Sequence, residues 1–117
     1  MIRYFKDGNY VIRAEQYFHH NLYMVNHYFG DLLTPIENSY DAMMKNWGVI
    51  EPGDYIVENI YGRKYARNRD AFDSDFSEFE IDYATYKEIH DRLKREEVVI
   101  EIKIKRNYAL DKSCITI

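Results

Sequence analysis

The chain has 117 residues, a formal net charge of -4 and a single cysteine, Cys114. Its length predicts one domain, residues 1–117, with a hydrophobic core of its own. The acidic balance excludes a protein that is basic over its whole surface, and one cysteine excludes an internal disulfide. The start lacks the apolar stretch of a signal peptide, and no apolar run approaches the roughly 18 residues of a membrane span. We therefore expect a cytoplasmic protein without a membrane partner.

The first part of the chain predicts a hairpin followed by two helices. Two apolar segments within residues 2–14 flank Asp7-Gly8-Asn9, whose residues accept positive φ, and this pattern is typical of a β-hairpin. A helix is predicted near 15–29, because apolar residues recur at spacings of four, three and four at Phe18, Leu22, Val25 and Phe29. A shorter helix is expected near 39–46.

The middle of the chain predicts a second hairpin and a short helix. Pro52-Gly53 provides the fixed φ and the positive φ of a type II turn, which starts a hairpin near 54–67. Phe72 and Phe76 are four residues apart, so they share one face of a helical segment within residues 70–76.

The last part predicts a helix and two strands. Asp82 is a suitable N-cap for a helix near 83–95 that carries an apolar stripe. Apolar and charged residues then alternate, which predicts a strand near 97–105, and a final strand is expected near 113–117. Hairpins with helices between them indicate an α+β domain built on a largely antiparallel sheet.

Residues 47–76 contain an aromatic and an aliphatic residue, then Pro-Gly-Asp-Tyr-Ile-Val, a glycine followed by an aromatic, and two aromatics four apart. This pattern resembles a short module of small, mostly uncharacterised proteins of bacteriophages and prophages. The matching positions are Trp47, Val49, Pro52, Gly53, Asp54, Tyr55, Ile56, Val57, Gly62, Tyr65, Phe72 and Phe76. After the glycine the family usually has an acid, whereas this chain has Arg63. The resemblance implies a phage-type origin and carries over no catalytic motif. Small accessory proteins of phages often bind and block a host machine, which favours an interaction role by analogy alone.

The predicted helix near 15–29 places polar side chains opposite its apolar stripe. Gln16, His20, Tyr23 and His27 follow one another at spacings of four, three and four. Two imidazoles two turns apart are too distant to chelate one metal ion by themselves. The stripe is therefore either a solvated polar face or a contact surface for a partner.

A basic cluster follows the turn of the second predicted hairpin. It consists of Arg63, Lys64, Arg67 and Arg69, interleaved with Tyr61 and Tyr65. Arginine beside aromatic rings suits single-stranded nucleic acid, so the alternative function is a small nucleic-acid-binding regulator. A solvated strand face explains the same pattern without a ligand.

An acid block comes next along the chain. Its members are Asp70, Asp73, Asp75, Glu78, Glu80 and Asp82. Rows of carboxylates can occupy the nucleic-acid groove of a partner, whereas the simpler interpretation is that acids favour the N-terminal ends of helices.

An enzyme hypothesis depends on Glu101 and Lys103, which with an upstream acid such as Asp82 would form a metal-dependent nuclease site. Any amphipathic strand alternates charges in this way, so we expect no enzyme, no metal and no cofactor.

The leading hypothesis is a non-enzymatic phage-type accessory protein that binds a host protein or protein–nucleic-acid complex, for example as an anti-defence inhibitor such as an anti-CRISPR protein. Aromatic residues and arginine would anchor the partner, and acids would steer the encounter. The partner-binding residues that we expect are His20, Tyr23, His27, Tyr61, Arg63, Arg67, Asp73, Asp75 and Glu78.

Overall fold

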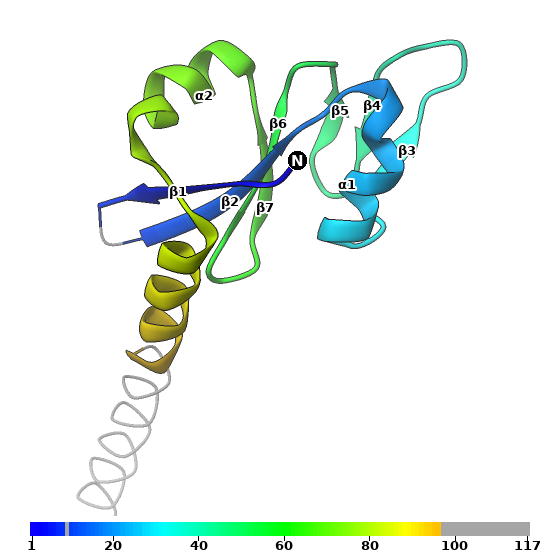
Figure 1. The fold of residues 1–117 in the computed structure, drawn as a ribbon. Helices are drawn as coiled ribbons and strands as arrows, with labels where there is room; N and C mark the ends of the chain where they lie inside the picture. Colours follow the sequence, from blue (N-terminus) through cyan, green and yellow to red (C-terminus); the bar gives the residue numbers. More distant parts are fainter. Residues whose placement is uncertain (9, 97–117) are drawn as a thin grey trace, which may run out of the picture.

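A computed structural model describes residues 1–8 and 10–96. Its larger sheet contains β1 (Arg3–Asp7), β2 (Tyr10–Gln16), β6 (Tyr55–Asn59), β7 (Lys64–Arg67) and β8 (Glu80–Ile81). The strands lie in the order β7-β6-β2-β1-β8, and each neighbouring pair is antiparallel (Figure 1). The two predicted hairpins are β1–β2 and β6–β7, and the predicted α+β class with a largely antiparallel sheet is confirmed.

One face of this sheet is covered by α2 (Arg69–Phe76). The Oδ1 atom of Asn68 caps its start and accepts the backbone N–H of Asp70 at 2.8 Å. Phe72 and Phe76 are buried and pack against Phe5 of β1. The predicted helical segment near 70–76, with both phenylalanines on one face, is therefore confirmed.

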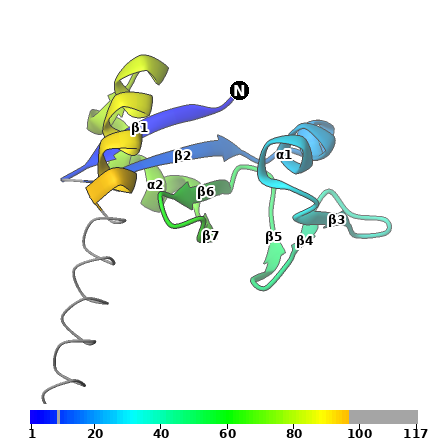
Figure 2. The ribbon, with the colours of Figure 1, turned by 90° about the horizontal axis from the view of Figure 1, so that it is seen from below.

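Residues 18–54, which we call the lobe, are inserted between β2 and β6, two strands that pair with each other. The lobe contains the 3-10 turn η1 (His19–Asn21), α1 (Leu22–Phe29) and a three-stranded antiparallel sheet of β3 (Leu33–Pro35), β4 (Ala42–Met44) and β5 (Gly48–Ile50). Figure 2 shows α1 on one side of these strands. The helix and the three strands of the lobe share one hydrophobic core with Ile56 of the larger sheet. The buried residues of this core are Tyr17, Leu22, Val25, Phe29, Leu32, Leu33, Ala42, Met44, Ile50 and Ile56.

Residues 83–96 form a helix, in agreement with the prediction near 83–95. The Oδ1 atom of Asp82 accepts the backbone N–H of Thr85 at 2.7 Å, as expected for an N-cap. Ile89 is buried against Val11 of β2 and Ile60. Within residues 1–8 and 10–96, no helix is long and apolar enough to cross a membrane.

The helix predicted near 15–29 begins later than expected, at Leu22. Glu15 and Gln16 continue β2 instead, because they pair with Ile56 and Tyr55 of β6. The apolar spacing of this segment extends across the junction, so periodicity alone did not locate the helix start.

The helix predicted near 39–46 is wrong, because this segment contains β4. Ala42 and Met44 are buried while Met43 between them is exposed, which is the period of a strand. Asn46 ends the segment with a φ of 61°, a value that a right-handed helix does not accept. The strands predicted near 97–105 and 113–117 lie outside the described residues.

Candidate interaction surface

The predicted polar stripe on the first helix does not form as one row. Gln16 lies in β2 and His20 in η1, whereas Tyr23 and His27 lie on the exposed side of α1. His20 stacks on the ring of Phe18 at 5.8 Å, with the planes 6° apart. Tyr23 and His27 are four residues apart on α1, so they share one face and remain together as surface residues.

The predicted basic cluster is divided by the fold. Lys64 and Arg67 point to opposite faces of the sheet, because they are three residues apart in β7. The Nζ atom of Lys64 lies 3.5 Å from Glu58 Oε2, and Arg67 forms an ion pair with Asp75 of α2. Arg69 lies 3.7 Å from the carboxylate of Asp70. Among the described residues, the fold therefore separates Lys64 from Arg67 and gives Lys64, Arg67 and Arg69 each an acidic neighbour.

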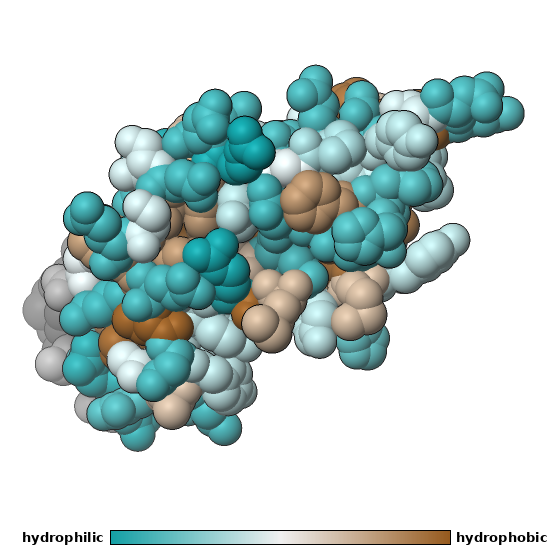
Figure 3. All heavy atoms as spheres, turned by 45° about the horizontal axis from the view of Figure 1, so that its top comes forward, coloured by the Kyte–Doolittle hydropathy of each residue, from teal (hydrophilic) through white to brown (hydrophobic). Residues whose placement is uncertain are grey.

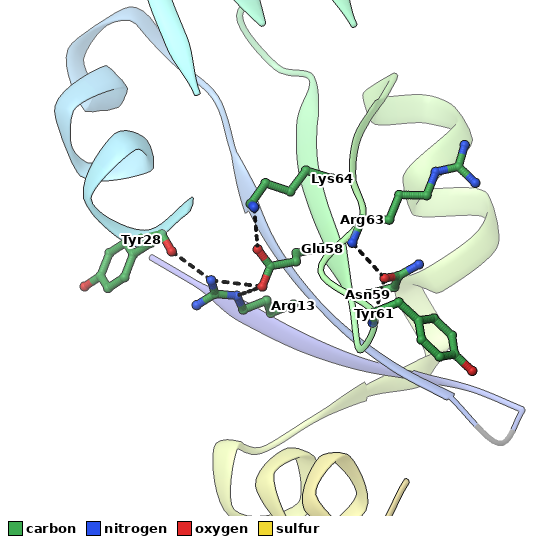
Figure 4. A network of polar contacts seen from close by, with 7 residues as sticks. All are labelled: Arg13, Tyr28, Glu58, Asn59, Tyr61, Arg63 and Lys64. Carbon is green, nitrogen blue, oxygen red and sulfur yellow. Dashed lines mark hydrogen bonds and ion pairs between the residues drawn. The ribbon is translucent and has the colours of Figure 1, made fainter. Parts of the chain in front are cut away.

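Arg63 and Tyr61 lie in the turn between β6 and β7. The Oδ1 atom of Asn59 accepts the backbone N–H of Tyr61 at 2.9 Å and that of Arg63 at 3.0 Å. Figure 4 shows Lys64 reaching toward Glu58 while the Arg63 side chain extends away from it. Arg63 is thus the member of the predicted cluster that this turn presents to solvent.

A second network joins the lobe to the larger sheet (Figure 4). Arg13 of β2 donates to Glu58 Oε1 at 3.1 Å and to the backbone carbonyl of Tyr28 in α1 at 2.7 Å. Its guanidinium also lies 4.9 Å from the ring centroid of Phe29, a cation–π distance. These contacts hold the last turn of α1 against the sheet.

Most of the acid block is engaged within the molecule. Glu80 accepts two hydrogen bonds from Arg3, at 3.0 and 2.9 Å, and the hydrogen bond lowers the pKa of its carboxyl. The pKa of Asp82 is also lowered, by its hydrogen bonds with Thr85. Asp75 pairs with Arg67, whereas Asp73 and Glu78 are exposed and form no ion pair with the described residues. The block therefore presents less free charge than its sequence indicates.

An apolar surface that sequence reasoning missed lies on the outer side of the lobe's sheet. We call Met43, Trp47 and Val49 the apolar sheet face; their exposed fractions are 45%, 51% and 54%. Met43 and Val49 are direct partners across β4 and β5. Each of these strands has three residues, too few for a period of two to stand out, and the helix predicted near 39–46 concealed the alternation.

Exposed large apolar side chains concentrate in the lobe as a whole. Of the 13 in the described chain, eight belong to residues 18–54: Phe18, Tyr23, Met24, Tyr28, Tyr40, Met43, Trp47 and Val49. Figure 3 shows, for one face of the molecule, that apolar side chains reach the surface in small groups between hydrophilic ones. A mixed surface of this kind is typical of protein–protein interfaces, which combine apolar anchors with a polar rim.

One charged side chain among the described residues is buried, that of Glu15 in β2, at 2% exposure. Its Oε1 atom accepts a hydrogen bond from the amino group of Met1 at 3.1 Å. Its Oε2 atom has no hydrogen-bond partner within the described residues. The carboxylate faces the protein interior, so it does not belong to the interaction surface.

A cleft of about 520 Å³ opens where the end of α1, the β4–β5 turn and the β6–β7 turn meet. Its charged lining residues are Asp31, Lys45 and Lys64, above the buried ring of Phe29.

No three His, Cys, Asp or Glu side chains within residues 1–8 and 10–96 come together in a way that could hold a metal ion. The hypothetical nuclease site consists of Asp82, Glu101 and Lys103. The structure describes only Asp82, which caps a helix, and the other two lie outside the described residues.

Comparisons with protein-family models, curated proteins and solved structures gave no match to this chain.

Proposed function

We propose that this protein is a non-enzymatic accessory protein of bacteriophage type, which acts in the host cytoplasm by occupying a surface of a host protein or protein–nucleic-acid complex. Inhibition of a host defence system is the role that we expect. The apolar sheet face of Met43, Trp47 and Val49 is the observation that carries the binding role, and the resemblance of residues 47–76 carries the phage origin.

The apolar sheet face has the properties of an anchor. Tryptophan and methionine are enriched at interfaces, and tryptophan supplies a large share of measured binding hot spots. The strands below are held by the buried side chains of Ala42, Met44 and Ile50. A partner would therefore meet a surface whose backbone is already ordered, which reduces the entropy lost on binding.

The residues predicted from the sequence divide into two groups. One group has exposed side chains and consists of His20, Tyr23, His27, Tyr61, Arg63, Asp73 and Glu78. Arg67 and Asp75 are bound to each other, so a partner would first have to break their ion pair. We therefore assign the main anchoring role to the apolar sheet face.

The test is affinity capture from a lysate of the host with the wild-type protein and with the double variant Met43→Gln/Val49→Thr. We expect the variant to lose the captured partner while its thermal unfolding stays close to wild type, because both side chains are exposed. Phe79→Gln is the matched control, since Phe79 is 48% exposed and lies outside the lobe. Equal capture by all three proteins contradicts the proposal, as does turnover of a nucleotide, nucleic acid or metabolite by purified protein.

A further inference from the structure

The charges of this chain are unevenly divided between the lobe and the remainder. Within residues 18–54 there are five acids and one lysine, a net charge of -4, and the acids are Asp31, Glu37, Asp41, Glu51 and Asp54. The whole chain has 16 basic and 20 acidic residues, so the sequence outside the lobe holds 15 of each. The lobe thus carries the entire formal net charge.

The ion pairs have the opposite distribution. The seven ion pairs in the described part of the chain all join groups outside the lobe. No cation among the described residues lies within 4.0 Å of a lobe carboxylate. The carboxylate of Asp54 accepts the backbone N–H of Glu51 at 2.9 Å, whereas Glu37 and Glu51 have exposed side chains. Among the described residues, the carboxylates of the lobe therefore have no ion-pair partner, although Lys45 and Lys64 line the same cleft as Asp31.

Two of these acids lie close to the apolar sheet face along the chain, and so does Lys45, the one lysine of the lobe, which is exposed between Met43 and Trp47. Glu51 follows Val49 by two residues, immediately beyond β5, and Glu37 follows β3 by two residues. Exposed charges act over roughly 10 Å at 0.1 M salt, a distance comparable to the spacing of two strands and their loops. Because Glu37 and Glu51 outnumber Lys45 and the lobe has a net charge of -4, a partner approaching Met43, Trp47 and Val49 meets a field that is negative on balance.

We propose that the partner of the apolar sheet face is a protein surface rich in arginine and lysine. This inference rests on the proposed function and specifies its partner. Opposite charge accelerates association and selects the partner, and the half-exposed indole of Trp47 can receive a guanidinium group by a cation–π contact. The same net charge opposes the phosphates of nucleic acid, so duplex DNA is the contrasting ligand in the test.

Trp47 provides the measurement, since it is the only tryptophan of the chain. Its fluorescence is followed while the full-length protein is titrated with a short arginine-rich peptide, with a glutamate-rich peptide of equal length, and with duplex DNA. We expect a saturable change with the arginine-rich peptide alone, weakening as salt is added. The double variant Glu37→Gln/Glu51→Gln should bind this peptide about tenfold more weakly.

The matched control is Glu88→Gln/Glu96→Gln, which removes the same amount of charge from exposed residues outside the lobe that the sequence does not predict to bind a partner. We expect it to bind like wild type. Equal weakening by both double variants would mean that net charge alone acts, and would overturn the inference. A missing response to the arginine-rich peptide, or a response to duplex DNA, also overturns it.

Failure of this inference is distinguishable from failure of the proposed function. If the arginine-rich peptide does not bind but Met43→Gln/Val49→Thr still abolishes partner capture, the docking face is correct and the charge of the partner is not. If that variant captures the partner as well as wild type does, the docking face itself is wrong.

Discussion

Arg13 of β2 donates a 2.7 Å hydrogen bond to the backbone carbonyl of Tyr28, in the last turn of α1. The same guanidinium binds Glu58 of β6, so one side chain connects two strands of the larger sheet to the lobe. The position of α1, and with it that of the lobe's own sheet, therefore depends on this polar contact as well as on the shared apolar core.

Replacing Arg13 should destabilise the protein and loosen the lobe. Arg13→Gln removes charge-assisted hydrogen bonds to a partly buried carboxylate and to a helix end, for which we expect a loss of about 1–3 kcal/mol in the free energy of unfolding. Urea unfolding of the wild type and the variant measures this difference in the free energy of unfolding. Arg69→Gln is the control, because the Arg69–Asp70 pair is exposed and should contribute at most about 1 kcal/mol. Equal effects of the two substitutions would show that the Arg13 network does not hold the lobe.

Phe72 should be among the most sensitive core positions. Its ring is stacked on Tyr55 with centroids 3.9 Å apart, and its side chain is 1% exposed. Phe72→Ala leaves a cavity between α2 and the sheet, so we expect a loss of about 3–5 kcal/mol in the free energy of unfolding. Phe79→Ala, at a 48% exposed position, should change it by about 0.5 kcal/mol or less. A mild effect of Phe72→Ala would indicate that α2 is not docked as the structure places it.

The cap of α2 offers a third measurement. The side chain of Asn68 accepts the backbone N–H groups of Asp70 and Ala71. Asn68→Ala leaves these donors without a side-chain partner and should cost about 1 kcal/mol, whereas Asn68→Asp keeps an acceptor and should stay close to wild type. Thermal unfolding monitored by circular dichroism compares the two variants. Similar losses for both would indicate that the cap bonds contribute little.

Stability should fall on acidification through the Arg3–Glu80 pair. The hydrogen bond with Arg3 lowers the pKa of the Glu80 carboxyl below its ordinary value of 4.5. A group whose folded-state pKa is lowered contributes stability above its unfolded-state pKa, and this contribution is lost as pH falls through the folded-state value. Urea unfolding from neutral pH down to the acidic side of pH 4.5 should show this loss.

The variant Glu80→Gln should flatten that acidic slope, because its side chain does not titrate. Glu78→Gln is the control, since Glu78 is exposed and forms no ion pair with the described residues. If the wild type and Glu80→Gln lose stability in parallel below pH 4.5, the Arg3–Glu80 pair does not cause the acid sensitivity.

The sequence predicted those elements that are specified by residues close together in the chain. The turn at Pro52-Gly53 formed as expected, with a φ of 100° at Gly53 and a 3.1 Å hydrogen bond from the Asp54 N–H to the Glu51 carbonyl. The hairpins, α2 and the Asp82 cap followed from turn residues, spacing and a capping side chain, all of which act within a few residues. The resemblance of residues 47–76 to phage proteins, and the function that it implies, stay predictions.

The candidate site was predicted only in part. The alternation of β7 already separates Lys64 from Arg67, but their acidic partners, Glu58 and Asp75, are known only from the folded chain. Met43 and Val49 became neighbours because β4 pairs with β5, a pairing that no local pattern indicated.

By itself, the sequence determined those parts of this protein whose conformation depends on near neighbours: its hairpin turns, the helical segment of Phe72 and Phe76, the helix capped by Asp82 and its α+β class. The tertiary structure decided that residues 18–54 form an insertion between two paired strands, and that the ion pairs among the described residues all lie outside this lobe. The physical reason is that three-residue strands and ion pairs are stabilised by groups distant along the chain. Which face becomes apolar and acidic is therefore set by packing.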